Sequence, residues 1–293
     1  MAYSNTISLF QQYIPILDEV YKNASLTSVL DGAPELMRQG NAANELIIPR
    51  MEMSGLADYS RDDGYVDGDV TLTSETVKCN YDRGRMFQVD TLDDAETAAV
   101  AFGALSGEFI RTKVVPELDA FRLATYASKT GIGSATGTLS TGKNVIEAIR
   151  AAHAAMDTAE APAEGRVLFI TSALKGAVDD MDTTDSRAAM DLVSQVIVVP
   201  QSRFYTAITL GSNGYTRRAA SGSGATAVTA GKDINFMLIQ KDAVIQYQKH
   251  IAPKIVTPEQ NQHADAWKFG YRTVGIADVY AGKVAGIYCH SKA

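Results

Sequence analysis

The sequence predicts an α+β protein that has two lobes, an N-terminal arm and a long hairpin. Three stretches of the chain support this prediction. Apolar residues recur at helical spacing from Thr91 to Ser128, which indicates one long helix. Two runs of strand character flank a stretch rich in Gly and Asp at residues 58–69, which indicates a long hairpin. Helical and strand patterns then alternate from residue 141 to about residue 250, as in an α/β lobe.

The composition is that of a globular chain with enough apolar residues for a large core. The chain has 293 residues, of which 46% are hydrophobic, and its formal net charge is −7. This acidic balance argues against a protein that binds nucleic acid through its phosphates, because such binding needs clustered Lys and Arg. No run of about 18 apolar residues predicts a membrane span, and the first ten residues lack the pattern of a secretory signal. We therefore expect a protein that stays in the cytoplasm where it is made.

Residues 1–50 predict an arm that cannot form a core alone. Short apolar helical pieces at residues 9–21 and 26–30 offer too little contiguous face. They are interrupted by residues that break helices, namely Pro15, Gly32, Pro34 and Gly40.

The next stretch predicts two facing strands, at residues 46–48 and 70–81, joined by an exposed tip. The tip carries five aspartates and one arginine: Asp58, Arg61, Asp62, Asp63, Asp67 and Asp69. Because these aspartates repel one another, we expect the tip to contact a neighbouring molecule that supplies Lys or Arg.

The long helix predicted at 91–128 begins at a cap, Thr91, which is followed by acidic residues in the first turn. Pro116 lies inside it and cannot donate to the carbonyl of Thr112, at a cost of roughly 3 kcal/mol, so we expect a kink or a break there. Pro116 is accordingly a candidate hinge. At about 1.5 Å per residue the helix would span roughly 55 Å, which is more than a compact core needs. This length indicates a spine that runs through an elongated molecule.

A Gly/Ser/Thr-rich link at 130–141 is expected to lead into the α/β lobe. Helices are predicted there at 144–158 and 173–181, and strands at 165–171, 195–199, 234–239 and 243–248. The last block, 267–288, is aromatic and rich in strand-forming residues. It places Trp267, Phe269 and Tyr271 on one face of a strand.

The sequence predicts no catalytic, cofactor-binding or metal-ligating site. The histidines at 153, 250, 263 and 290 have no metal-ligand spacing, and the two cysteines, Cys79 and Cys289, form no CxxC pair. The glycines at 131, 133 and 137 follow a helix rather than a strand, unlike those of a dinucleotide-binding loop. The stretch 221–224 lacks a full GxSxG elbow. The tip aspartates lack the alternating ligands and closing Glu of a calcium loop.

The order of these parts resembles the major capsid proteins of tailed bacteriophages, which have the Hong Kong 97 type of fold. Two blocks support the resemblance. The first is similar to the family's passage from the extended loop into the spine helix: Asp82, Arg83, Phe87, Val89, Asp90, Asp93, Glu96 and Thr97. The second is similar to its closing strands: Asp265, Ala266, Trp267, Lys268, Tyr271, Arg272, Tyr280, Gly286, Ile287 and Tyr288.

The resemblance implies a structural shell subunit, not an enzyme, that forms hexamers and pentamers of itself and encloses double-stranded DNA without binding a sequence. It implies an N-terminal arm at 1–50, an extended loop at 51–90, a peripheral domain with the spine at 91–140, an axial domain at 141–250 and returning strands at 251–293. Assembly would take place in the bacterial cytoplasm and the product would be the virion. No cofactor and no membrane contact is implied.

Two departures from the family pattern qualify the partners. The chain lacks the long charged N-terminal segment that serves some members as a scaffold, so a separate scaffolding protein, or none, is implied. Portal and decoration proteins are further partners of such shells. Some members crosslink a loop lysine to an asparagine. Lys78 and Asn261 are the nearest candidates by position, without any supporting motif.

Two other readings remain open. The same fold serves encapsulin-like bacterial compartments that hold a cargo enzyme, but these usually begin with a charged helix, whereas residues 6–21 carry little charge. An enzyme with its site in the α/β lobe is the remote alternative, because no paired acid, base and nucleophile motif is found.

Overall fold

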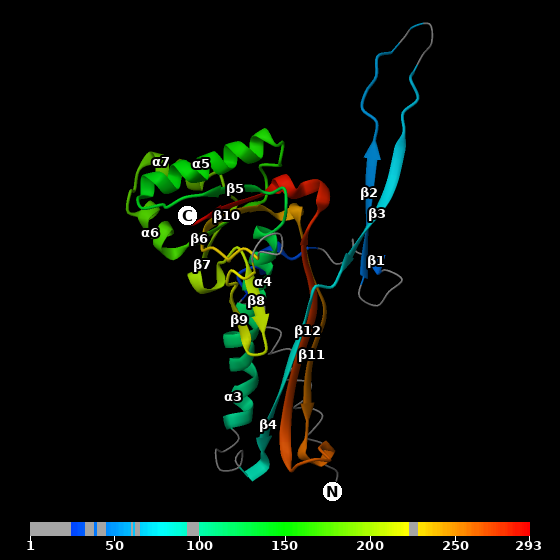
Figure 1. Cartoon of the computed structure of the whole chain (residues 1–293), viewed down its shortest axis with the longest axis vertical. Coiled ribbons are helices and arrows are strands. Elements are labelled where there is room, and N and C mark those ends of the chain that lie inside the picture. Colours follow the sequence, from blue (N-terminus) through cyan, green and yellow to red (C-terminus); the bar gives the residue numbers. More distant parts are fainter. Residues whose placement is uncertain are drawn as a thin grey trace.

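The computed structural model describes residues 25–32, 38–39, 45–59, 61, 65–92, 100–222 and 228–293. Several sequence predictions lie outside these residues: the arm before Ser25, the tip residues Asp62 and Asp63, and the first turns of the long helix at 93–99. Figure 1 shows an elongated molecule with an α/β lobe at one end. A long sheet and a helix run away from this lobe, and a hairpin projects beside it. No described helix is long and apolar enough to cross a membrane.

The α/β lobe is centred on a five-stranded sheet with the strand order β5-β13-β10-β6-β7. The central strands β6 and β10 are buried along their whole length because helices cover both faces of the sheet. The strands are β5 (Gly133–Thr136), β6 (Arg166–Thr171), β7 (Gln195–Val199), β10 (Ile234–Gln240) and β13 (Ile287–Ser291). The predicted strands at 165–171, 195–199 and 234–239 are thereby confirmed.

Three helices cover one face of this sheet (Figure 1). They are α5 (Gly142–Thr158), α6 (Ser172–Asp179) and α7 (Thr184–Met190). The first two match the predicted helices, whereas α7 was missed. Thr183 caps α7 through a capping box with Ser186, so the signal for its start was present in the sequence.

The predicted link at 130–141 is wrong in part, because residues 133–136 form β5, which pairs in parallel with β13. Small residues carry little strand signal of their own, and here the packing decides. A Cβ at Gly133 would lie 2.6 Å from the ring of Tyr288, so only glycine permits this close approach.

The spine is helical without interruption from Val100 to Ala127, but not α-helical throughout. It consists of α3 (Val100–Phe109), a π-helical turn (Ile110–Val114) and α4 (Val115–Ala127). In the π turn the N–H of Val115 donates to the carbonyl of Ile110, and Pro116 follows directly. The break that the sequence predicted at Pro116 is therefore wrong, because a π turn accommodates the missing donor within a continuous helix. Whether Pro116 acts as a hinge stays a prediction.

The spine packs on a long sheet with the order β11-β12-β4. Its strands are β4 (Tyr81–Asp90), β11 (Val244–Val256) and β12 (Ala266–Val279). Phe269 and Tyr271 are buried beneath the spine, as their predicted common face required. β4 lies within the stretch 51–90 that was assigned to the extended loop, and it pairs with β12. The strand predicted at 243–248 was too short. β11 continues beyond residue 248 through Pro253, which is tolerated because β11 is an edge strand.

The hairpin consists of β2 (Glu45–Met53) and β3 (Val70–Lys78), with a short strand β1 (Arg38–Gln39) added to β2. The antiparallel pairing of the two predicted strands is confirmed. A smaller hairpin of β8 (Ile208–Gly211) and β9 (Gly214–Arg217) extends from the α/β lobe. Short 3₁₀ segments lie at Ser28–Leu30, Gln201–Arg203, Lys241–Ala243, Pro258–Gln260 and Ala281–Gly286.

The segment Ser25–Asp31 is fixed to the spine by a buried carboxylate. Asp119 is fully buried, and it accepts hydrogen bonds from the Ser25 hydroxyl (2.8 Å), the Leu26 N–H (3.1 Å), and the N–H and hydroxyl of Thr27 (3.3 and 2.7 Å). Arg203 from the α/β lobe approaches the same carboxylate at 3.4 Å. A buried charge is tolerated only when it is paired and hydrogen-bonded, and Asp119 meets both conditions. This middle segment of the predicted arm is therefore part of the core.

Candidate assembly interface

The hairpin presents an apolar face that no described part of its own chain covers. Met51 lies opposite Leu72 and Met53 lies opposite Val70, and directly opposed residues of an antiparallel pair point to the same side. These four side chains are 59%, 66%, 70% and 65% exposed, respectively. We call them the apolar hairpin face. Exposed apolar patches of this kind mark sites of contact with other molecules.

The base of the hairpin is held firmly to the body. Asn80, in the turn between β3 and β4, donates to the carbonyl of Ala277 (2.7 Å) and accepts from its N–H (3.1 Å). Val77 is buried against Ile245 and Ile276. The hairpin is thus rooted at its base while its outer half projects (Figure 1).

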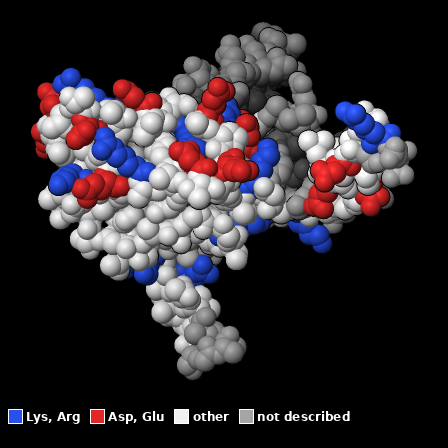
Figure 2. Space-filling view, turned by 90° about the horizontal axis from the view of Figure 1, so that it is seen from above, with Lys and Arg blue, Asp and Glu red and all other residues white. Residues whose placement is uncertain are grey.

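The tip carries the charges that the sequence analysis singled out. Asp58, Arg61, Asp67 and Asp69 are exposed, and Asp62 and Asp63 lie outside the described residues. Figure 2 shows acidic side chains, with a smaller basic group, at the hairpin end on the right of the view. Asp69 also closes the base of the tip. Its N–H donates to the Ser54 hydroxyl at 2.9 Å, and its carbonyl accepts from the N–H of Ser54 at 3.0 Å.

The sheet face that points away from the spine is a second exposed surface, which we call the outer sheet face. Cross-strand neighbours on it are Lys254, Gly270 and Met86 in one row, and Arg272 and Gly84 in the next. Met86 is 55% exposed, and Lys254 and Arg272 are exposed cations, of which Arg272 pairs with Asp82 at 2.6 Å. The surface combines an apolar side chain with positively charged side chains, and no side chain projects from Gly84 or Gly270. Its two cations are opposite in sign to the tip aspartates, although Asp82 offsets the charge of Arg272.

An ion pair and several hydrogen bonds join the α/β lobe to the spine and the long sheet. Arg83 on β4 pairs with Glu117 of α4 at 2.8 Å and donates to the carbonyl of Gly211 at 2.7 Å. Its neighbour on the same face, Arg85, donates to the carbonyl of Ser212 at 2.8 Å. Burial and the Glu117 carboxylate raise the pKa of Tyr81, which donates to that carboxylate. The turn between β8 and β9 is thus fixed against the body.

Lys78 and Asn261, the candidates by position for a covalent crosslink, have different surroundings. Lys78 lies at the end of β3 and is exposed. Asn261 is 9% exposed; its amide donates to the carbonyl of Ala266 at 3.1 Å and accepts from Lys268 at 2.8 Å. These hydrogen bonds give Asn261 a structural role in the turn before β12.

Two buried histidines belong to the α/β lobe. His153 accepts at Nδ1 from the buried Arg166 at 3.0 Å, because a guanidinium can only donate. Burial, and then the Arg166 charge, lower the pKa of His153. His290 stacks on Phe236, its Nδ1 lies 3.0 Å from the Asn235 amide nitrogen, and burial lowers its pKa as well. Both rings are therefore neutral at pH 7.

The described residues hold no group of three or more His, Cys, Asp or Glu placed to bind a metal ion. Cys79 and Cys289 are both free; Cys289 is buried in the lobe, and burial raises its pKa to about 12. Such a thiol is inert as a nucleophile.

The sequence pattern predicted the hairpin and its acidic tip but not the apolar hairpin face. The signal was present, because Met51 and Met53 flank Glu52, and Val70 and Leu72 flank Thr71. The sequence does not give the strand register. A shift by one residue would place the two methionines on one side of the hairpin and Val70 and Leu72 on the other.

Comparison with known proteins identifies the fold. No protein-family model matches the chain, and no curated protein matches it. Among solved structures, the capsid of the cyanophage P-SCSP1u has a TM-score of 0.56 and 13% identity over 87% of this chain and 85% of that chain. The mature capsid of bacteriophage PhiM1 gives 0.53 and 12% over 86% and 83%. A virus-like particle from Pyrococcus furiosus gives 0.54 and 11% over 93% and 98%. The chain therefore has the fold of tailed-phage capsid proteins, as the resemblance implied.

Proposed function

We propose that the chain is the major capsid protein of a tailed bacteriophage, a structural subunit that assembles with copies of itself into the icosahedral shell around the double-stranded DNA genome. The observation that carries the proposal is the apolar hairpin face, which projects from the body on a rooted base. A subunit that has this fold and also exposes such a face needs a neighbour to cover it.

In this proposal the parts take the roles that the resemblance implies. Residues 1–50 form the arm, 51–90 the extended loop, 91–140 the peripheral domain, 141–250 the axial domain and 251–293 the returning strands. Hexamers and pentamers of the chain build the shell, and a separate scaffolding protein, a portal and decoration proteins are its further partners. The shell encloses DNA without binding a sequence, and the virion is where the protein resides.

The covering surface that fits the hairpin best is the outer sheet face of the neighbouring copy. Met86 offers an apolar contact there, and its side chain covers Gly270, with its Cε 3.1 Å from the position that a Cβ at Gly270 would take. The exposed cations Lys254 and Arg272 complement the aspartates of the tip. Burying one Leu side chain contributes about 1.5–3 kcal/mol, and a shell repeats the contact in every subunit.

A pair of adjacent substitutions tests this proposal. Leu72→Gln places an amide in the apolar hairpin face, whereas Thr71→Gln places the same side chain on the opposite side of the same strand. We expect Leu72→Gln to reduce the yield of shells in negative-stain microscopy and light scattering, and Thr71→Gln to leave it close to that of the wild type. Equal yields for the two variants would contradict the proposed role of this face.

The partner surface is tested separately by photo-crosslinking. A photoreactive amino acid at Leu72 should join the peptide of a second copy that contains Met86 or Lys254. Crosslinks confined to other peptides would place the contact elsewhere, even if shells form.

A second candidate is a bacterial compartment shell of the encapsulin type. The observation that favours it is the likeness to the Pyrococcus furiosus particle, which extends over 98% of that chain. Purification of the particles from their natural source separates the two functions. A phage head contains nuclease-protected DNA, whereas a compartment contains one or a few cargo proteins that mass spectrometry identifies.

A further inference from the structure

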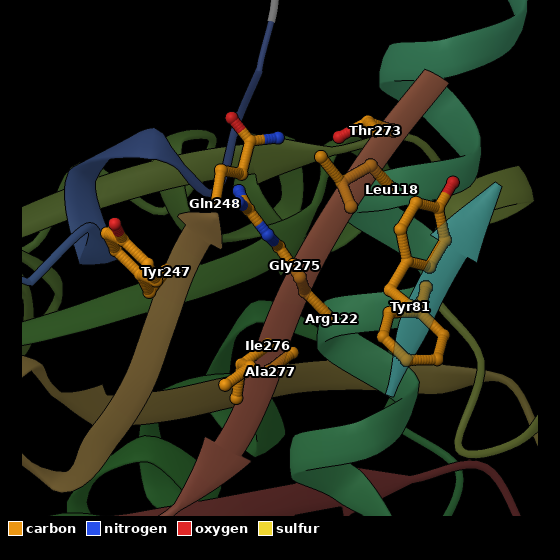
Figure 3. A pocket seen from close by; sticks show the side chains of 10 residues that line it. Tyr81, Leu118, Arg122, Tyr247, Gln248, Thr273, Gly275, Ile276 and Ala277 are labelled. Carbon is orange, nitrogen blue, oxygen red and sulfur yellow. The ribbon is translucent and has the colours of Figure 1, made fainter. Parts of the chain in front are cut away.

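A small cavity lies where the spine crosses the upper part of the long sheet (Figure 3). Its volume is about 10 Å³. Leu118, Phe121 and Arg122 of α4 form one wall. The rest comes from strand residues, namely Tyr81, Tyr247, Gln248, Thr273, Gly275, Ile276 and Ala277. The cavity therefore lies between the spine and the strands β11 and β12.

The sequence of β12 explains why space remains there. The residues of β12 that face the spine are aromatic at 269 and 271 and then small at Thr273, Gly275 and Ala277. In addition, β11 bulges at this level, because the register shifts between Gln248 and His250. A bulge twists and bends its strand, so β11 changes direction beside the cavity while Tyr247 and Gln248 stay paired with β12. The gap results from small side chains on one strand and a bulge on the other.

The cavity contains a polar group that needs a partner. Thr273 is 2% exposed, and its hydroxyl has no hydrogen-bond partner among the described residues. An orphaned buried hydroxyl costs about 1–3 kcal/mol, so such groups are rare in folded proteins.

Two further polar side chains line the same space. Gln248 and Arg122 both line the cavity, and in Figure 3 the amide end of Gln248 lies on the side of Thr273 while the guanidinium of Arg122 lies below that amide. Arg122 is buried and donates to the Thr27 hydroxyl at 2.9 Å, and a guanidinium carries five N–H donors in all. The site thus offers one donor group and two groups that can donate or accept.

We propose that this cavity binds one structural water molecule, held by the Thr273 hydroxyl and bridging β12 to Arg122 of the spine and Gln248 of β11. The volume matches a single water, since a buried water needs roughly 10–15 Å³ and two to four polar partners. Nothing larger fits in about 10 Å³. The water gives the Thr273 hydroxyl its partner and ties the bulge of β11 to the spine. This inference does not depend on the proposed function.

The sign of one stability change tests the proposal. Thr273→Val replaces the hydroxyl by a methyl group on a side chain of the same shape. If the hydroxyl were orphaned, its removal would relieve an unmet desolvation cost and raise the urea midpoint of the purified chain. If the hydroxyl holds a water, the substitution removes hydrogen bonds, and the midpoint falls. We expect a fall at least as large as that of Thr125→Val, which removes a hydroxyl already bonded to the carbonyl of Phe121 at 2.8 Å.

A direct observation complements this test and does not require a folded variant. An experimental structure at a resolution that orders core waters should show density within hydrogen-bond distance of Thr273 Oγ1. A midpoint of Thr273→Val equal to or above that of the wild type would overturn the proposal. So would the absence of that density in a map that resolves other buried waters.

Discussion

Substitution of Asp119 by Asn should release the arm segment Ser25–Asp31 from the spine. In the native protein Oδ1 of Asp119 accepts from Ser25 and twice from Thr27, while Oδ2 accepts from the Leu26 N–H and from Arg203. An asparagine has a single oxygen. If that oxygen takes the Oδ1 position, the amide NH₂ points at two donors, the Leu26 N–H and the Arg203 guanidinium.

The cost of Asp119→Asn follows from these contacts. The orphaned N–H of Leu26 costs about 1–3 kcal/mol. The three remaining hydrogen bonds lose their charged acceptor and weaken from about 1.5–3 to about 1 kcal/mol each. Arg203, whose side chain is 21% exposed, can turn toward water and adds little. Part of the loss is regained by relaxation, so we expect the free energy of unfolding to fall by about 3–5 kcal/mol, the range typical of a broken buried ion pair.

The matched control is Asp31→Asn, which removes a charge from the same network at its exposed rim. The Asp31 side chain is 50% exposed, its ion pair with Arg122 is long at 3.7 Å, and an Asn oxygen can still accept from Gln246. We expect a loss below about 1 kcal/mol. Urea unfolding measures both variants, and hydrogen exchange at the Leu30 and Asp31 amides, which bond within this segment, reports its local release. Comparable losses for the two variants, or unchanged exchange in Asp119→Asn, would refute the argument.

Three further predictions concern the hinge, the pH dependence and the tip. Pro116→Ala should let the π turn revert toward an α-helix, stabilise the isolated subunit and impair closure or expansion of shells; mutant shells that match the wild type in size and yield would reduce the π turn to a packing feature. The folded-state pKa values of His153 and His290 are lowered from 6.5, so as the pH falls below about 6.5 the unfolded chain binds protons first and stability declines; a urea midpoint that is constant between pH 7.5 and 5.5 would contradict this. Asp62→Asn with Asp63→Asn should lower assembly yield most at low salt, and equal yields at low and high salt would leave the tip without an electrostatic role.

The elements that the sequence predicted well are those whose pattern is local. α5 follows the N-cap Thr141, and β6 is a run of apolar residues between turns, so each could be placed from its own residues. A local effect of Pro116 could be expected because a missing N–H acts within one turn, but the predicted kink or break was not the outcome, since the π turn that replaces it depends on how the helix packs.

The features that the sequence did not predict depend on partners distant in the chain. β5 exists because Gly133 lies against Tyr288, which is far away in sequence. The role of Asp119 was equally hidden, since its donors come from residues 25–27 and from Arg203. A buried carboxylate in a helix has no signature in one sequence, whereas an exposed acidic tip is visible directly.

The hairpin combines two properties that together restrict its choice of partner. A long strand pair with an exposed apolar face tends to pair with its own kind, which is the usual route to aggregation. Here the apolar hairpin face leads into a tip with exposed Asp58, Asp67 and Asp69, so two hairpins that met tip to tip would bring like charges together. The same charges are attracted by a surface that carries exposed Lys254 and Arg272. We infer that the acidic tip acts against contact between hairpins and in favour of contact between a hairpin and a sheet. The apolar face then contributes most of the binding energy, and the tip determines which surface receives it.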